Sequence, residues 1–228
     1  MTTPFQPTPG FWANTPPPYD TGLATSYPFN VDQANTRHQL EAAQTEKLRV
    51  ETAHLKEAYE HPRTFLFTDG VTAGTTDTCM EVLSHWAGQS KEPITIKIMS
   101  PGGSIYAGFA LYDFLLELRE EVDIITQSMS AASIAALIAQ AGTTRTITPN
   151  GYMMVHQAST IAQGSSSTLR DQSALLDQLE DQYMRLMVQR ANVDIDFVKS
   201  KTDRKDWWMN SLEALEHGFV DSIRTPAI

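Results

Sequence analysis

The sequence predicts an α/β protein with a mainly parallel sheet. From residue 63 onward, short apolar segments alternate with longer segments whose apolar residues recur at helical spacing. Strands that alternate with helices in this way form βαβ units, in which the strands run parallel. No internal repeat is evident. We therefore expect residues 63–228 to form one domain.

Two further segments precede this domain. Residues 1–30 are rich in Pro, Thr and Gly and lack periodicity, which predicts a disordered or extended tail. Its aromatic residues raise the alternative of a segment that orders on a partner. Residues 31–62 consist of helix formers with a thin apolar stripe, which predicts a helical extension that packs on a neighbouring surface or on another copy. Pro62 ends this extension, because proline disfavours helix at the residue before it.

Within the domain, each element follows from its own pattern of apolar residues. The expected strands are 64–67, 94–99, 122–129, 144–148, 152–157 and 219–223. The expected helices are 75–88, 104–120, 133–142, 167–192 and 210–218. The long helix at 167–192 carries more apolar residues than one narrow stripe needs. This excess predicts burial against a second copy of the chain, unless a wide stripe is buried within one chain.

Composition excludes several classes of protein. The net charge of −10 argues against nucleic acid or an anionic membrane as the main partner, because both repel an acidic protein. Cys79 is the only cysteine, which excludes an intrachain disulfide and fits a small buried residue. No apolar run approaches the ~20 residues of a membrane span, and no signal-peptide pattern begins the sequence. The expected location is the cytoplasm.

A serine marks the first candidate site. Ser133 lies where an apolar strand ends and a helix begins, with small alanines on both sides. Free amide groups and the positive end of the helix dipole would stabilise an oxyanion formed there. Serine is also a preferred N-cap residue, and by itself the position favours a cap. The neighbouring Ser128 and Ser130 are alternative nucleophiles.

A serine nucleophile needs a base and an orienting carboxylate. His156 ends an apolar strand, and histidine titrates near neutral pH. Four aspartates follow the long helix, and spacing does not choose among them: Asp194, Asp196, Asp203 and Asp206.

The stretch "SPGGS" at 100–104 follows another buried strand. Two glycines let the backbone approach a bound group closely and direct amide N–H groups at it. The stretch lacks the ending of a nucleotide P-loop and the spacing of a dinucleotide fold. No pair of His or Cys residues has zinc spacing, so no metal or cofactor is expected. A GxSxG nucleophile elbow is also absent.

Four collinear segments carry a family resemblance: "SPGGSIYAGFALYD", "SAASIAALIAQAG", "PNGYMMVHQ" and "DWWMNSLEALEHGFVDSI". Together they resemble the proteolytic subunit of the Clp protease, ClpP, from about residue 63 to residue 223. The resemblance implies a ClpP/crotonase-like fold with parallel sheets, a protruding long handle helix and an irregular N-terminal extension. Phage head-maturation proteases include members of the same family, and an acidic chain with an unrelated Pro-rich N-terminus would suit one.

The resemblance assigns roles to individual residues. Ser133 falls on the nucleophile, His156 on the base and Asp206 on the triad acid, with Asp203 in reserve because this loop looks one residue longer than usual. Gly103 and Ile134 fall on the donors of the oxyanion hole. The implied activity is that of a serine endopeptidase without a cofactor of its own.

The resemblance also implies partners. They are a homo-oligomeric ring, usually two stacked heptamers, a protein or peptide substrate, and either an AAA+ unfoldase or phage capsid proteins. A phage protein would act in the host cytoplasm.

The sequence departs from the family at three places. Met129 replaces a glycine and is expected to reshape the approach to Ser133, Ala158 replaces a proline, and the strand expected after it is Ser-rich. These changes leave a single ring plausible. Two other functions stay open: a non-catalytic ring subunit and a crotonase-type acyl-CoA enzyme. An intact Ser, His and Asp count against the first, and the lack of a basic CoA-binding cluster counts against the second.

Overall fold

The computed structural model describes residues 42, 44–45 and 63–224. The chain divides into two compact units, Met1–Leu48 and Arg49–Ile228. In the first unit the three described residues are helical.

The predicted tail at 1–30 lies outside the described residues, and so does nearly all of the extension predicted for 31–62. Both segments and their boundaries stay predictions. The following paragraphs concern residues 63–224.

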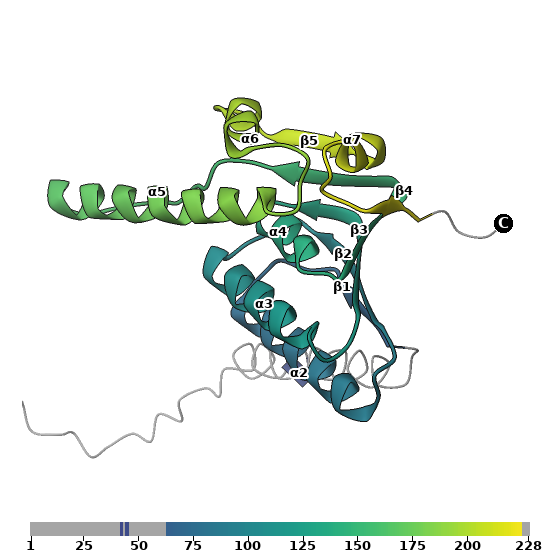
Figure 1. Cartoon of the computed structure of the whole chain (residues 1–228). Coiled ribbons are helices and arrows are strands. Elements are labelled where there is room, and N and C mark those ends of the chain that lie inside the picture. Colours follow the sequence, from purple (N-terminus) through teal and green to yellow (C-terminus); the bar gives the residue numbers. More distant parts are fainter. Residues whose placement is uncertain (1–41, 43, 46–62, 225–228) are drawn as a thin grey trace, which may run out of the picture. The chain divides into compact units, whose positions relative to one another are not determined.

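Six strands form one sheet, as Figure 1 shows. β1 to β4 lie side by side in chain order and pair in parallel, which confirms the predicted α/β class. β5 pairs with β4 in the antiparallel direction, and β6 pairs with β4 in parallel. The strands are β1 (Thr64–Phe67), β2 (Ile94–Ser100), β3 (Ile124–Ala132), β4 (Thr144–Val155), β5 (Trp207–Asn210) and β6 (Ser222–Ile223).

Three helices connect the parallel strands, and three more follow β4. They are α2 (Ala73–Gln89), α3 (Ile105–Leu118), α4 (Ile134–Gln140), α5 (Ser166–Val188), α6 (Ile195–Thr202) and α7 (Ser211–Glu216). No helix within the described ranges is long and apolar enough to cross a membrane.

The core lies between the sheet and the connecting helices. Alternate residues of β2, namely Ile94, Ile96 and Ile98, are fully buried. All seven residues of α4 are buried as well. The α3 helix approaches α4 closely because Gly108 has no side chain: a Cβ there would lie 2.0 Å from the Ile134 side chain. This packing fixes the first turn of α4, the turn that follows Ser133.

The structure differs from the predicted elements in the region after β3. The two strands predicted at 144–148 and 152–157 are one strand, β4, because its pairing with β3 shifts register and accommodates the intervening residues. No strand forms over 158–165, although the resemblance implied one there. Asp194 caps a separate helix, α6, where a loop was expected. Residues 207–209, which form most of β5, were also predicted to lie in a loop.

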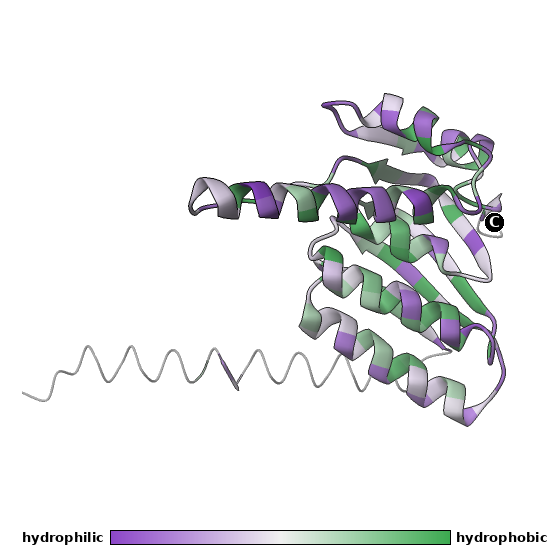
Figure 2. Ribbon diagram, turned by 60° about the vertical axis from the view of Figure 1, so that its left-hand side comes forward, coloured by the Kyte–Doolittle hydropathy of each residue, from purple (hydrophilic) through white to green (hydrophobic). Residues whose placement is uncertain are grey.

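The long helix α5 has two unlike halves. Residues 166–175 are all exposed, and Figure 1 shows this half projecting beyond the sheet. The second half contains the buried residues Tyr183, Met184 and Met187. Figure 2 shows that polar residues dominate the helix, while the strands and α4 are mostly apolar.

Candidate active site

Ser133 sits between the end of β3 and the start of α4. It occupies the N-cap position, but its side chain makes no capping hydrogen bond. Its φ of 58° and ψ of −132° lie outside the regions that L-residues commonly adopt. The backbone around it holds this conformation, because the Ser133 N–H donates to the Met154 carbonyl at 2.8 Å and the Ala136 N–H donates to the Ser133 carbonyl at 2.9 Å. The hydroxyl is thus free for a role other than capping.

His156 follows the last residue of β4 and meets that hydroxyl. The distance from Ser133 Oγ to His156 Nε2 is 2.7 Å. The two residues come together because β3 and β4 are parallel neighbours, so their carboxyl ends lie at the same edge of the sheet. The alternative serines lie within β3, and Ser128 Oγ is buried without a described hydrogen-bond partner. Neither Ser128 nor Ser130 makes a described hydrogen bond to His156.

Asp206 is the aspartate beside the other ring nitrogen. Its Oδ1 lies 3.7 Å from His156 Nδ1, and its side chain is 54% exposed. Asp203 instead ends α6, and Asp194 caps the start of that helix by accepting from the Phe197 N–H. Among the described residues, neither of these carboxylates nor Asp196 pairs with His156. The Arg204 N–H donates to Gln157 Oε1 at 3.3 Å, so the loop that carries Asp206 is tied to the segment after His156.

The two glycines of "SPGGS" are both required by their surroundings. Gly102 has a φ of 91°, and a Cβ on it would lie 2.6 Å from the Ser133 Cβ. Gly103 has a φ of 153°, and a Cβ on it would lie 2.3 Å from the Val71 carbonyl oxygen. Val71 pairs with this segment through bonds to the Gly102 carbonyl and the Ser104 N–H. Glycine therefore lets the loop pass directly beside Ser133.

Two amide groups remain unpaired at this place. No hydrogen bond joins the N–H of Gly103 or of Ile134 to another residue between 63 and 224. For Ile134 the reason is general, since the first amides of a helix have no intrahelical acceptor. Both residues line the same groove as Ser133 and His156.

That groove has a volume of about 560 Å³ and lies between the loop after β2, the start of α4 and one face of α5. Its remaining walls are mostly apolar or small: Ile105, Tyr106, Ala158, Ile161, Leu175, Leu176, Leu179 and Tyr183. Met129 does not line it. This residue is the extra one in β3 where the pairing with β2 shifts register, and its side chain is 39% exposed.

Two polar contacts from α5 were missed by the sequence analysis. The Tyr183 hydroxyl donates to the Ser133 carbonyl at 3.2 Å, and Glu180 Oε2 accepts from the Ala158 N–H at 3.0 Å. Tyr183 is 4% exposed, and this burial raises the pKa of its phenol. The sequence analysis treated Tyr183 only as one of the many apolar residues of the long helix at 167–192. Its partner lies 50 positions away, and no local pattern reveals such a contact.

The arrangement has the parts of an acyl-transfer site. A hydroxyl lies within hydrogen-bonding distance of an imidazole, a carboxylate lies beyond the imidazole, and two residues whose amides have no described partner line the same groove. Cys79 takes no part, because it is fully buried and burial raises the pKa of its thiol. Among the described residues, no cluster of three or more His, Cys, Asp or Glu side chains could hold a metal ion.

Comparison with known proteins gives matches over most of the chain. A family model described as Clp protease matches residues 49–227. The ATP-dependent Clp protease proteolytic subunit of Bacteroides thetaiotaomicron is 35% identical over 132 residues, which cover 57% of this chain and 59% of that protein.

Two further relatives show the same similarity. The ATP-dependent Clp protease proteolytic subunit 1 of Leifsonia xyli is 36% identical, over 62% of this chain and 72% of that protein. The corresponding subunit 2 of Tropheryma whipplei is 33% identical, over 65% of this chain and 83% of that protein. The matched region therefore spans between 59% and 83% of these three relatives.

Proposed function

The chain belongs to the Clp protease family of serine peptidases, and from this premise we propose that it is itself a serine endopeptidase with Ser133 as its nucleophile. The observation that carries the proposal is the 2.7 Å hydrogen bond between Ser133 Oγ and His156 Nε2, made at the edge of a groove. A serine hydroxyl is weakly nucleophilic unless a base accepts its proton, and this contact supplies the base.

The proposed reaction has two halves. His156 Nε2 takes the proton of Ser133 as Oγ bonds to the peptide carbonyl carbon, and it returns that proton to the nitrogen as the C–N bond breaks. Water then attacks the acyl-enzyme carbonyl carbon while His156 takes its proton, and His156 returns that proton to Ser133 Oγ as the ester bond breaks and the acid is released. Neither half of this reaction needs a metal or a cofactor.

The amides of Gly103 and Ile134 are the proposed donors to the tetrahedral oxyanion. Their lack of a described partner and their place on the groove support this role. Losing one such donor typically costs about 100- to 1000-fold in rate. The dipole of α4 adds positive potential at the same point, because its first turn follows Ser133 directly.

Asp206 is the proposed third member of the triad. A carboxylate next to Nδ1 favours the tautomer with a proton on that nitrogen, which leaves Nε2 free to accept from the serine. The distance of 3.7 Å between Asp206 Oδ1 and His156 Nδ1 is longer than that of a hydrogen bond. Catalytic contacts often shorten only when substrate is bound. Asp203 stays the reserve, and its contacts give no support for the role.

We further propose that the chain works as one subunit of an oligomeric ring that encloses these sites. The exposed half of α5 supports this, because Leu169 and Leu175 are 40% and 46% exposed there. Relatives are named proteolytic subunits of ATP-dependent proteases, so the proposed partner is a separate ATPase that delivers unfolded protein. Seven subunits per ring, capsid proteins as partners and a cytoplasmic location stay predictions.

Labelling with a fluorophosphonate probe tests the proposal. The probe phosphonylates a serine activated by a neighbouring base, so the wild-type chain should be labelled and Ser133→Ala should not. Ser128→Ala and Ser130→Ala serve as matched controls, since each removes a hydroxyl from the same strand, and both should keep labelling. Casein or peptide cleavage should follow the labelling pattern.

The alternatives predict different results, two in the labelling experiment and one in a binding measurement. A non-catalytic ring subunit would not be labelled at all, and its Ser133→Ala variant would behave like the wild type. Labelling that moves with Ser128 or Ser130 would show that the nucleophile is misassigned. A crotonase-type enzyme would bind an acyl-CoA thioester, which calorimetry on the unlabelled chain would detect.

A further inference from the structure

Two side chains of α5 reach the backbone on either side of the candidate site. Tyr183 donates its hydroxyl hydrogen to the carbonyl of Ser133, and Glu180 accepts from the amide of Ala158, two residues after His156. Residues three apart on a helix lie on the same face, one turn from each other. One helical face is therefore bonded to both chain segments that carry the Ser–His pair.

The Ser133 contact matters because of that residue's backbone. Conformations such as φ 58° and ψ −132° are strained in L-residues and persist only when the surroundings hold them. Two of the three bonds that hold the Ser133 backbone come from other backbone groups, Met154 and Ala136. The Tyr183 hydroxyl supplies the third, and it is the only one of the three that a substitution can remove without changing the main chain.

The Ala158 contact has a similar role on the histidine side. β4 ends at Val155, and the chain from His156 to Ser165 has no regular secondary structure. Strand pairing therefore does not hold the segment just after the histidine. The Glu180 carboxylate provides a fixed acceptor there, and hydrogen bonds to a charged acceptor are stronger than neutral ones.

We infer that Tyr183 and Glu180 are positioning residues that set the distance between Ser133 Oγ and His156 Nε2 from one face of α5. The inference rests on the proposed function, since positioning has meaning only if this pair is catalytic. It also gives α5 a second role: a displacement of this helix would move both members of the pair. Tyr183 can donate across the working pH range because burial raises the pKa of its phenol.

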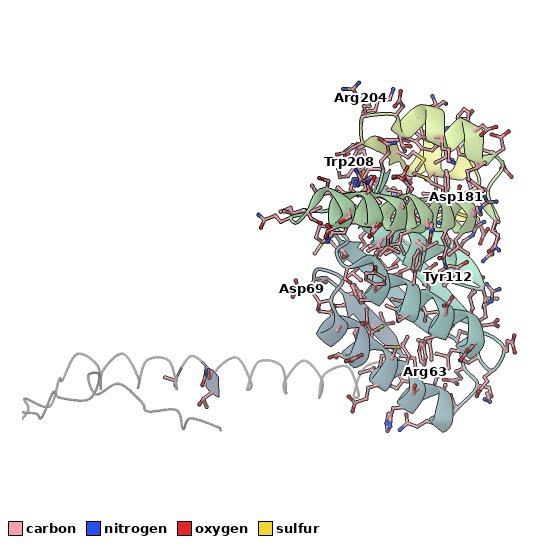
Figure 3. The ribbon with its side chains drawn as sticks, turned by 90° about the vertical axis from the view of Figure 1, so that its left-hand side faces the viewer. Arg63, Asp69, Tyr112, Asp181, Arg204 and Trp208 are labelled. Atoms are coloured by element: carbon pink, nitrogen blue, oxygen red, sulfur yellow. The ribbon has the colours of Figure 1, made fainter. Side chains whose placement is uncertain are left out.

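The variants Tyr183→Phe and Glu180→Gln test the inference, and each has a matched control. Tyr112→Phe removes another buried phenol hydroxyl that bonds to the α5 segment, because Tyr112 donates to Gln189 Oε1 at 3.4 Å. Asp181→Asn changes the carboxylate next to Glu180, which pairs with Arg185 and Lys199 instead. Figure 3 labels Tyr112 on α3 and Asp181 on α5.

The measurement separates binding from chemistry. The fluorophosphonate probe gives a maximal labelling rate constant, kinact, and a half-saturating concentration, KI. Losing one positioning hydrogen bond should lower kinact about tenfold in each test variant and leave KI within about twofold. The control variants should keep the kinact of the wild type, although Tyr112→Phe should lower the melting temperature as much as Tyr183→Phe does.

The outcomes distinguish the two proposals. Wild-type kinact in both Tyr183→Phe and Glu180→Gln would overturn the positioning role and leave the proposed function intact. A change in KI alone would also overturn it, because that result means contact with the bound group rather than alignment of the pair. A wild-type chain that reacts no faster than Ser133→Ala would overturn the proposed function and the inference together. If Tyr183→Phe does not fold, Glu180→Gln decides, since Glu180 is only partly buried.

Discussion

The two halves of α5 belong to one helix but have opposite surroundings. The half that ends at Val188 buries Tyr183, Met184 and Met187 against the domain and bonds to the candidate site. The half at 166–175 is exposed throughout, although it contains Leu169 and Leu175. The difference between the halves lies in what each half contacts.

The difference teaches where geometry is fixed and where it depends on a partner. Ser133 is held by β3, by the fully buried α4 and by three hydrogen bonds to its backbone. The groove wall from Ser159 to Ile161 belongs to no helix or strand in the described part of the chain, and the Ile161 side chain is 94% exposed. We therefore expect substitutions near Ser133 to affect chemistry within one chain. Substitutions on the exposed half should affect assembly and substrate binding.

The largest effect is expected from Gly102→Ala. The new methyl group would overlap the Ser133 Cβ and the Ala132 carbonyl oxygen, at a φ that alanine rarely adopts. Displacing both the serine and the neighbouring Gly103 amide should lower probe labelling on the order of 10,000-fold. Urea unfolding should show a loss of roughly 2–3 kcal/mol.

Gly88→Ala is the matched control, because nothing lies within 4 Å of a Cβ on this glycine of α2. It should stabilise the fold by about 0.5–1 kcal/mol and leave labelling unchanged. Near wild-type labelling in Gly102→Ala would mean that the region around Ser133 is as adaptable as the exposed half of α5, and the comparison would fail.

A smaller loss is expected from Asp206→Asn. The amide cannot hold the imidazole with its proton on Nδ1 as a carboxylate does, so kcat should fall on the order of 100- to 1000-fold at neutral pH. Asp203→Asn should leave kcat unchanged, because Asp203 is not paired with His156 in the described part of the chain. If Asp203→Asn abolished activity and Asp206→Asn did not, the loop between α6 and β5 would be misaligned with the family, and Asp203 would be the triad acid.

The triad residues show how much of the site could be predicted from the sequence alone. Local patterns placed Ser133 and His156 each at the end of an apolar strand, but by themselves they favoured a cap for Ser133 and left Ser128 and Ser130 as alternatives. The family resemblance chose Ser133 as the nucleophile. The choice of Asp206 over Asp203 needed the family resemblance, since charged residues in a loop have no periodic pattern. β5 and α6 were missed because both are short, with four and eight residues, and charged residues lie within α6 and between the two elements. Tertiary packing rather than local preference decides their structure.

Other parts of the site could not be predicted at all. The bulge at Met129 and the single long β4 depend on how two strands pair. The residue pattern of one strand alone does not reveal that pairing. The Tyr183 contact with Ser133 depends on how α5 crosses α4. Gly102 illustrates the intermediate case: the glycine pair predicted a close backbone approach, and the structure shows that the approached group is Ser133 itself.

The exposed half of α5 is tested by Leu169→Glu. Leu169 lies outside the groove, and its exposure means that a charge there should not disturb the isolated chain. If α5 joins subunits, sedimentation at micromolar concentration should show smaller species than the wild type, with the melting temperature of the domain nearly unchanged. Identical sedimentation of variant and wild type would remove Leu169 from any interface. Ser173→Glu, another exposed position on this half, controls for charge alone.

The smallest effect concerns the end of α5 beyond the buried half, where Arg190, Arg145 and Asp221 form a network. Arg145 donates to Asp221 at 2.6 Å, and Arg190 lies 3.6 Å from the same carboxylate. Burial alone would raise the pKa of Asp221, but the hydrogen bonds and charge of Arg145 and the charge of Arg190 lower it below the usual value. A lowered pKa in the folded state gives stability at neutral pH, and this stability is lost as the pH falls through the folded pKa.

Asp221→Asn should therefore cost roughly 2 kcal/mol of unfolding free energy at neutral pH, because Arg145 loses a charged partner. The cost should shrink in acid, where the wild-type carboxylate becomes protonated. Asp181→Asn is the control: the pKa of Asp181 is also lowered, by hydrogen bonds from Arg185 and Lys199, but the pair is on the surface and screened by salt. Urea unfolding at neutral pH and at about pH 3 measures both variants. An equal loss at both pH values would mean that Asp221 acts through packing rather than through its charge, so the buried end of α5 would not be held electrostatically.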